Sequence, residues 1–303
     1  MTLLIGTASW TDPTLLACGR FYPPHANDAE SRLHHYASRF DTVEADASYY
    51  ALPDPHTAYL WTRRTPPGFV FNLKAFRAFT GHRVPLAALP ADLRRDWPGA
   101  PATLYGEQLP ASWRDELWRR FLLAVEPLRM ADKLGAVHFQ FAPWVRRDAR
   151  GAARVADCAR RMEGLPMAVE FRQRSWFDGE SATQSTLAML RELGAIHTVV
   201  DAPQGSDDTV PAVWACTHPD LALVRLHGRN AAAWHARGSA SSSRFQYVYT
   251  PEELAELAAR IKRLARQAKR TQALFNTNYE DHGMRNAAGL AAALQPQPQP
   301  RLA

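Results

Sequence analysis

Eight short apolar runs are spread along the chain, and the polar residues within most of them keep one parity. In the run 167–172, alternation places Glu170 and Arg172 on one side of an extended strand and Val169 and Phe171 on the other. Each such run predicts a strand with one apolar and one polar face. The other runs that follow this pattern lie at 3–7, 41–44, 69–74, 137–141, 198–201, 223–227 and 273–278.

Helical spacing of apolar residues fills most of the gaps between these runs. The predicted helices span 29–40, 113–134, 152–163, 181–193, 251–268 and 284–294. The connections after the second and sixth strands offer only short helices, at 58–64 and 211–218. Strands that alternate with helices are typical of a parallel sheet. A chain of 303 residues suits one α/β domain of the (β/α)8 or TIM-barrel type, which takes about 250 residues or more. We therefore expect a single barrel domain over residues 1–294.

Two segments of the sequence are rich in proline, and the first departs from a minimal barrel. Segment 83–112 follows the third predicted strand, and its five prolines rule out one continuous helix. Because it follows the carboxyl end of a strand, it begins on the face where barrels carry their active sites, and we expect a partial lid. Segment 295–303 is polar and alternates Gln with Pro, which predicts a disordered tail.

The composition indicates which kind of partner the protein binds and which cell compartment it occupies. The 36 Lys and Arg against 30 Asp and Glu give a net charge of +6, which favours an anionic partner unless the charge only solvates the surface. Three widely spaced cysteines without a paired motif are typical of the reducing cytosol. No run approaches the roughly 18 apolar residues of a membrane span, so we expect a soluble cytoplasmic protein.

The polar faces supply candidate catalytic groups. Glu44, Glu170, Asp201 and His227 all stand at predicted strand ends, where carboxylates and an imidazole can perform acid–base chemistry. A structural alternative stays open, because Arg172 and Arg225 can neutralise Glu170 and Asp201 in a polar plug without catalytic function.

A second group of strand-end residues is suited to binding. Arginine holds phosphate or carboxylate through two hydrogen bonds, and an aromatic ring can stack on a base or sugar. The aromatic residues can equally cap the barrel core. The candidate substrate-binding residues are Trp10, Tyr50, Lys74, Gln140, Arg172, Trp176, Arg225, Arg229 and Asn276.

The case for a metal or cofactor is weaker. The carboxylates and His227 come from four strands and suit a divalent metal, but the spacings HxH and HExxH and paired cysteines are missing. Arg172 and Arg225 would also repel a bound cation. No GxSxG elbow or glycine-rich phosphate loop occurs in the sequence. We therefore predict neither metal nor cofactor and keep a divalent ion as the alternative.

Several motifs resemble those of the YecE-like family, domain-of-unknown-function family 72. The resemblance covers nearly the whole chain and implies a TIM barrel, but it supplies no function. Ala142 stands where the family usually has the first of two prolines, and Thr277 stands where it has the second of two asparagines. The motifs are Gly6-Thr7-Ala8-Ser9-Trp10, Phe21-Tyr22-Pro23, Glu44-Ala45-Asp46-Ala47-Ser48-Tyr49-Tyr50, Phe139-Gln140-Phe141-Ala142-Pro143, Val169-Glu170-Phe171-Arg172-Gln173-Arg174-Ser175-Trp176, Arg225-Leu226-His227-Gly228-Arg229 and Phe275-Asn276.

The leading hypothesis is an enzyme acting on a phosphorylated or phosphodiester substrate, which includes nucleic acid. Glu170 and His227 would form the acid–base pair, and Arg172, Arg225 and Arg229 would clamp the anion. One alternative is an enzyme acting on a sugar or another small anionic metabolite. A second alternative is a barrel that binds a ligand or nucleic acid without catalysis.

Overall fold

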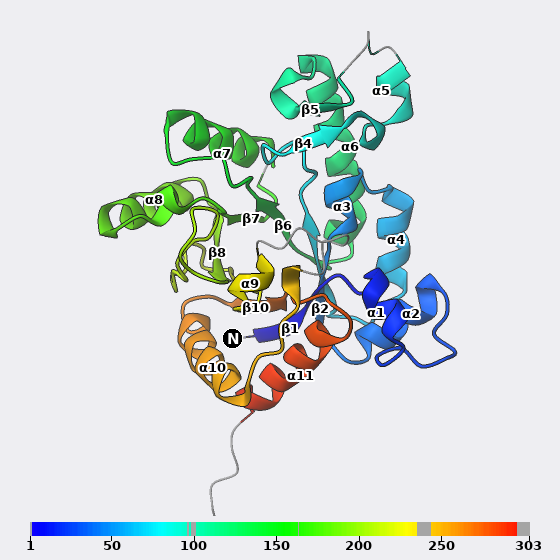
Figure 1. Cartoon of the computed structure of the whole chain (residues 1–303). Coiled ribbons are helices and arrows are strands. Elements are labelled where there is room, and N and C mark those ends of the chain that lie inside the picture. The colour runs from blue at the N-terminus through cyan, green and yellow to red at the C-terminus, as the bar shows by residue number, and fades with distance from the viewer. Residues whose placement is uncertain (1, 96, 98–100, 163, 235–243, 296–303) are drawn as a thin grey trace, which may run out of the picture.

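The computed structural model describes residues 2–95, 97, 101–162, 164–234 and 244–295. Within these residues, eight parallel strands close into a barrel in the order β1-β10-β9-β8-β7-β6-β3-β2 (Figure 1). Strands that follow one another in the chain are neighbours in the barrel, so the predicted (β/α)8 fold is confirmed. The barrel strands are β1 Thr2–Ala8, β2 Thr42–Ala45, β3 Val70–Lys74, β6 Leu134–Gln140, β7 Met167–Glu170, β8 Ile196–Asp201, β9 Leu221–Leu226 and β10 Arg270–Phe275.

Helices pack around the outside of the barrel (Figure 1). Their starts follow local capping chemistry: Thr250 and Glu253 form a reciprocal capping box at the start of α10, with Pro251 in the first helical position. The helices connecting barrel strands are α1 Pro13–Cys18, α2 Ala29–Ala37, α3 Ala47–Tyr50, α4 Pro55–Arg63, α6 Ala111–Met130, α7 Ala149–Arg161, α8 Glu180–Glu192, α9 Ala231–Trp234, α10 Pro251–Ala265 and α11 His282–Leu294, with a 3-10 turn η3 at Arg174–Phe177.

One predicted helix does not form. Residues 211–218 lie between β8 and β9 without helical structure. The segment instead supplies hydrogen bonds to β8: the Thr217 hydroxyl accepts from the backbone of His197 at 2.7 Å, and Val213 O lies 2.9 Å from its Nε2. Tertiary hydrogen bonding therefore takes precedence over the apolar spacing in this connection.

The barrel interior is filled and divided into two zones. Near the amino end, the Asn72 amide donates to Gln272 across the lumen at 2.6 Å, and Asn72 Oδ1 accepts from the Ala136 backbone at 2.8 Å. Gly135 makes room for this pair, because a Cβ there would lie 2.2 Å from Asn72 Oδ1. The apolar residues of the interior are Ala136, Ala168, Ile196, Leu221, Leu223 and Leu274. A charged zone follows at the carboxyl end.

The proline-rich insertion after β3 forms a small subdomain beside the barrel. Its hairpin pairs β4 Arg83–Pro85 with β5 Thr103–Tyr105, followed by the turn η2 Gly106–Gln108. Glu107 ties it to α7 through Arg150 at 2.7 Å and Arg154 at 3.0 Å. The remaining described elements of the insertion are η1 Leu86–Ala88 and α5 Ala91–Arg95.

This insertion lines cavities with the loops after β2 and β6, so it lies beside the carboxyl-end mouth rather than under the barrel. Its role as a lid stays a prediction. Residues 96 and 98–100 of the insertion and 296–303 of the predicted tail lie outside the described residues. No helix in the described part of the chain is long and apolar enough to cross a membrane.

Candidate active site

A fully buried arginine joins two glutamates at the carboxyl end of the barrel. Arg225, at the end of β9, donates to Glu44 Oε1 from β2 and to Glu170 Oε2 from β7, each at 2.7 Å. All three side chains are without solvent contact. Strand alternation places them inward as predicted from sequence, because each shares its face with the apolar residues of the lumen. The carboxylates hold both ends of the guanidinium.

The two glutamates differ in their affinity for a proton. Burial raises the pKa of Glu44 to about 8, and Arg225 offsets only part of this effect. Burial would raise the pKa of Glu170 as well, but Arg225 and His227 hold it well below its ordinary value. Glu44 is therefore protonated at neutral pH and Glu170 is ionised.

His138 lies between these carboxyl groups. Its Nδ1 is 3.2 Å from Glu44 Oε2, and its Nε2 is 3.4 Å from Glu170 Oε2. Burial lowers the pKa of His138 to about 4, so the ring is neutral. With its proton on Nε2, facing the ionised Glu170, the Nδ1 lone pair can accept the proton of Glu44. The geometry and the two shifted pKa values thus describe one consistent protonation state.

The second oxygen of Glu170 has its own set of donors. Gln140 donates at 2.8 Å and Arg172 at 3.1 Å, while His227 Nε2 lies at 3.4 Å. The Asn276 amide nitrogen is 2.9 Å from His227 Nδ1, which assigns the imidazole proton to Nε2. Burial lowers the pKa of His227 to about 3. His227 is thus neutral, and its Nε2 faces Glu170 without a regular hydrogen bond.

Above the buried cluster, the mouth carries partly exposed cations. Lys74 Nζ lies 3.9 Å from Asp46 and 4.9 Å from the Tyr49 ring centroid. His82 packs against the same Tyr49 ring, and burial beside Lys74 lowers the pKa of His82 to about 3. The mouth therefore keeps its positive charge on lysine and arginine.

Arg172 connects the mouth to the buried cluster. Its guanidinium carbon lies 4.7 Å from the centroid of the Trp234 ring on α9, a cation–π contact, while one nitrogen reaches Glu170. The side chain is 15% exposed, in contrast to the inaccessible Arg225. Arg172 is thus placed to meet a ligand from solvent, whereas Arg225 is not.

Asp201 and Arg229 lie in a separate network. Arg229 donates to both oxygens of Asp201 at 2.9–3.2 Å, and the Tyr249 hydroxyl donates to Asp201 at 2.7 Å. The register aligns Asp201 with Leu226, whose neighbour Arg225 faces inward, so Asp201 points out of the lumen. The expectation that Asp201 joins Glu170 and His227 in one pocket is therefore wrong, because its parity is opposite.

The three predicted aromatic ligands have different surroundings. Trp10 packs edge-on against Trp61 at 5.5 Å, and Trp176 stacks on Phe171 at 3.9 Å while its Nε1 donates to a backbone carbonyl. Both are buried and belong to the core. Tyr50, by contrast, is exposed beside Tyr49. Only Tyr50 is placed to stack on a ligand.

Sequence reasoning missed two members of the cluster. His138 shares parity with Gln140 in the same strand, so the alternating pattern already placed its ring inside the barrel. Asp46 shares parity with Glu44, but it follows the last residue of β2, where the pattern gives no orientation. In the described residues, no group of three or more His, Cys, Asp or Glu side chains is arranged to hold a metal ion.

Similarity to known proteins agrees with this architecture. The family described as Protein of unknown function DUF72 matches residues 4–303. The chain belongs to the DUF72 family. Its curated relatives include the UPF0759 protein YunF of Bacillus subtilis, 32% identical over 279 residues, which covers 91% of this chain and 89% of YunF. The UPF0759 protein YecE of Escherichia coli K12 is 28% identical over 140 residues, 41% of this chain and 47% of YecE.

Two crystal structures of DUF72 proteins share the barrel. The one from Enterococcus faecalis V583 has a TM-score of 0.78 at 24% identity and covers 98% of this chain and 97% of its own. The one from Thermotoga maritima MSB8 has a TM-score of 0.77 at 26% identity and covers 98% of this chain and 100% of its own. The resemblance to the YecE-like family is thus confirmed, and the fold with it, while no activity accompanies these names.

Proposed function

We propose that this DUF72 barrel is an enzyme that performs acid–base chemistry on a phosphorylated substrate bound at the carboxyl-end mouth. One observation carries the proposal: Glu44 and Glu170 share Arg225, yet their pKa values are shifted in opposite directions. Two carboxyl groups with such different proton affinities are a pattern typical of catalytic acid–base sites.

Glu44 is the proton donor in this proposal. Its Oε2 lies 3.2 Å from His138 Nδ1, which can accept its proton. An acid with a pKa near the working pH holds a proton and can still release it. Glu170 stays ionised and holds the Arg225 guanidinium that both carboxyl groups share. This assignment replaces the predicted Glu170 and His227 pair, because burial lowers the pKa of His227 to about 3, too low for an effective base or acid at neutral pH.

Arg172 and Lys74 are the anion-binding residues. Both keep partial exposure at the mouth, and each is paired with a single carboxylate at 3.1 Å and 3.9 Å. An incoming phosphate offers stronger charge-assisted hydrogen bonds than the long Lys74–Asp46 contact. Arg225 and Arg229 are already bound by two or more carboxylates each, so they balance charge within the protein instead.

A turnover screen tests the proposal. Purified protein is assayed with p-nitrophenyl phosphate, bis-p-nitrophenyl phosphate and a set of p-nitrophenyl glycosides. We expect turnover of a phosphate ester that falls at least about 100-fold in E44Q, the range of a lost general acid. R172A should instead raise KM. E180Q, in the exposed first turn of α8, is the matched control and should behave as the wild type.

Three outcomes separate the hypotheses. Turnover of glycosides alone would replace the phosphorylated substrate by a sugar. Saturable binding of inorganic phosphate without turnover would make the barrel a binder. Turnover that is unchanged in E44Q would remove Glu44 from the chemistry.

A further inference from the structure

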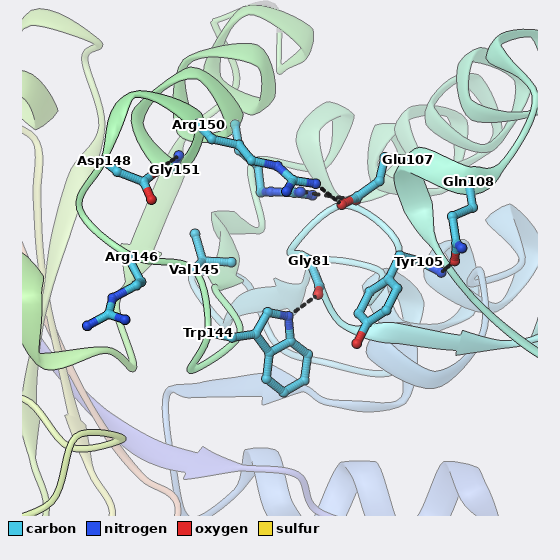
Figure 2. Close-up of a pocket in the computed structure, with 11 residues that line it drawn as sticks. Gly81, Tyr105, Glu107, Gln108, Trp144, Val145, Arg146, Asp148, Arg150 and Gly151 are labelled. Carbon is cyan, nitrogen blue, oxygen red and sulfur yellow. Dashed lines mark hydrogen bonds and ion pairs between the residues drawn. The ribbon is translucent and has the colours of Figure 1, made fainter.

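A second cavity lies beside the mouth, between the insertion and the start of α7 (Figure 2). We call it the Trp144 pocket. Its volume is about 450 Å³, within the range of about 300–1,000 Å³ that small-molecule sites occupy. It contains none of the residues assigned to acid–base chemistry or to the mouth cations. Its principal lining residues are Tyr105, Glu107, Trp144, Arg146, Arg150 and Arg154.

Trp144 presents a fixed aromatic surface to this cavity. Its side chain is 53% exposed, although its Nε1 donates to the Gly81 carbonyl at 2.9 Å. Gly81 has a φ of +82° and no room for a side chain, since a Cβ would lie 2.9 Å from Val145. Glycine therefore suits this position, and its hydrogen bond to the indole orients the exposed ring. Figure 2 shows Trp144 and Tyr105 next to each other along one side of the pocket.

The charge of the Trp144 pocket favours an anion. Three arginines face two carboxylates, those of Glu107 and Asp148, so the lining carries a net positive charge. Arg150 and Arg154 share Glu107, and Arg146 points away from that group toward the opposite end (Figure 2). The Arg146 guanidinium forms no hydrogen bond or ion pair with any residue that the structure describes. The arginines thus have donor groups available for a phosphate.

We propose that the Trp144 pocket binds a mononucleotide, with the base stacked on Trp144 and the phosphate held by Arg146. A base offers a flat π surface to the indole, and stacking of this kind tolerates any base. The insertion bounds the cavity on one side and α7 on the other, which suits one nucleotide. The proposal is independent of the acid–base function, because it uses none of the same residues.

Isothermal titration calorimetry on the full chain tests this with AMP, adenosine and inorganic phosphate as probes. We expect AMP to bind more tightly than either fragment. W144A should weaken AMP binding by about tenfold or more and leave phosphate binding unchanged, since only stacking is lost. W144F keeps a ring at this position and should retain much of the affinity. R146A should weaken the binding of AMP and of inorganic phosphate and leave the binding of adenosine unchanged.

Matched controls come from the same surface. Arg147 is adjacent in sequence and exposed, but it does not line the pocket and bonds to Ser185. Tyr59 on α4 is 50% exposed and far from the pocket lining. R147A and Y59A should bind AMP as the wild type does.

The proposal is overturned if AMP binds no more tightly than inorganic phosphate, or if W144A behaves like Y59A. If R172A lost AMP binding and W144A kept it, the nucleotide would bind in the mouth, and the proposal would also be overturned. Binding that follows Trp144 and persists in E44Q supports the pocket, even where the turnover screen finds no activity.

Discussion

Arg225 forms two short ion pairs from a position without solvent contact, so both glutamates depend on it for charge balance. R225A would leave Glu170 ionised and buried without its main partner. We expect the free energy of unfolding to fall by about 3–5 kcal/mol, measured by urea denaturation. The exposed pair Arg129–Glu126 is the control, and R129A should cost less than about 1 kcal/mol. Equal losses in the two variants would show that Arg225 is not the counter-charge of the cluster.

Glu44 gives the stability of the protein a measurable pH dependence. Its pKa is raised to about 8, so between about pH 4.5 and 8 the folded state holds a proton that the unfolded state releases. Stability from this group is therefore present at low pH and is lost as pH rises, by at most about 1.4 kcal/mol per pH unit. E44Q removes this titration, so the stability of E44Q relative to the wild type should increase from pH 5 to pH 8.

The buried histidines act in the opposite direction. The lowered pKa values of His138, His197 and His227 make stability rise between about pH 4 and 6.5. Because these residues are present in both proteins, the difference between E44Q and wild type isolates Glu44. A difference that stays flat from pH 5 to 8 in denaturation curves would mean that Glu44 is ionised throughout.

At the scale of elements, the pairing of β3 with β6 contains a register shift, and one side chain supplies a hydrogen bond that the shift removes. The register shifts between Phe71 and Leu73, and the Asn72 amide accepts from Ala136 N in place of a ladder carbonyl. N72A would leave the buried backbone N–H of Ala136 and the side-chain oxygen of Gln272 without hydrogen-bond partners. We expect a loss of about 2–4 kcal/mol in the free energy of unfolding, by chemical denaturation. Substitution of the exposed Asn27 by alanine is the control. If N72A lowered the free energy of unfolding no more than N27A does, Asn72 would not stabilise the junction of β3 and β6.

The elements also show where sequence patterns suffice. Met167–Glu170 and Leu221–Leu226 follow clear alternation, and their polar residues face inward as predicted. The same pattern is predicted for Thr198-Val199-Val200-Asp201, but its two adjacent valines leave the parity of Asp201 open, and the pairing with β9 determines that Asp201 faces outward. The helix expected at 211–218 fails for a related reason, since its hydrogen-bond partners are in β8.

For the whole molecule, the fold can be predicted from the sequence, but the protonation states of Glu44 and Glu170 cannot. Eight polar-ended runs separated by helices are enough to predict a closed parallel barrel. Which glutamate keeps its proton depends on the number of donors around each carboxyl group in three dimensions. Five donor groups surround Glu170, drawn from Arg225, Arg172, Gln140, His138 and His227. No spacing along the chain contains that information.

Cys158 offers a reporter of global unfolding. It lies on the buried face of α7, and burial raises its pKa to about 12, whereas Cys18 and Cys216 are partly exposed. Because the thiolate is the reactive form, Cys158 should react with dithionitrobenzoate only when the molecule unfolds. Two thiols should titrate in native buffer and three in denaturant. In C158A, only two thiols should react in denaturant as well. If all three thiols of the native wild type reacted equally, the packing around α7 would be contradicted.

The Asn72–Gln272 pair and the apolar residues beside it fill the barrel below the charged cluster. In the part of the chain that the structure describes, these residues separate the charged cluster from the cavity at the amino end of the barrel, so a reactant reaches Glu44 from the carboxyl end. A reactant that enters there has no second route out, so its product leaves by the same way before another molecule can enter. For a reaction at Glu44, added product should compete with substrate and raise KM without changing kcat.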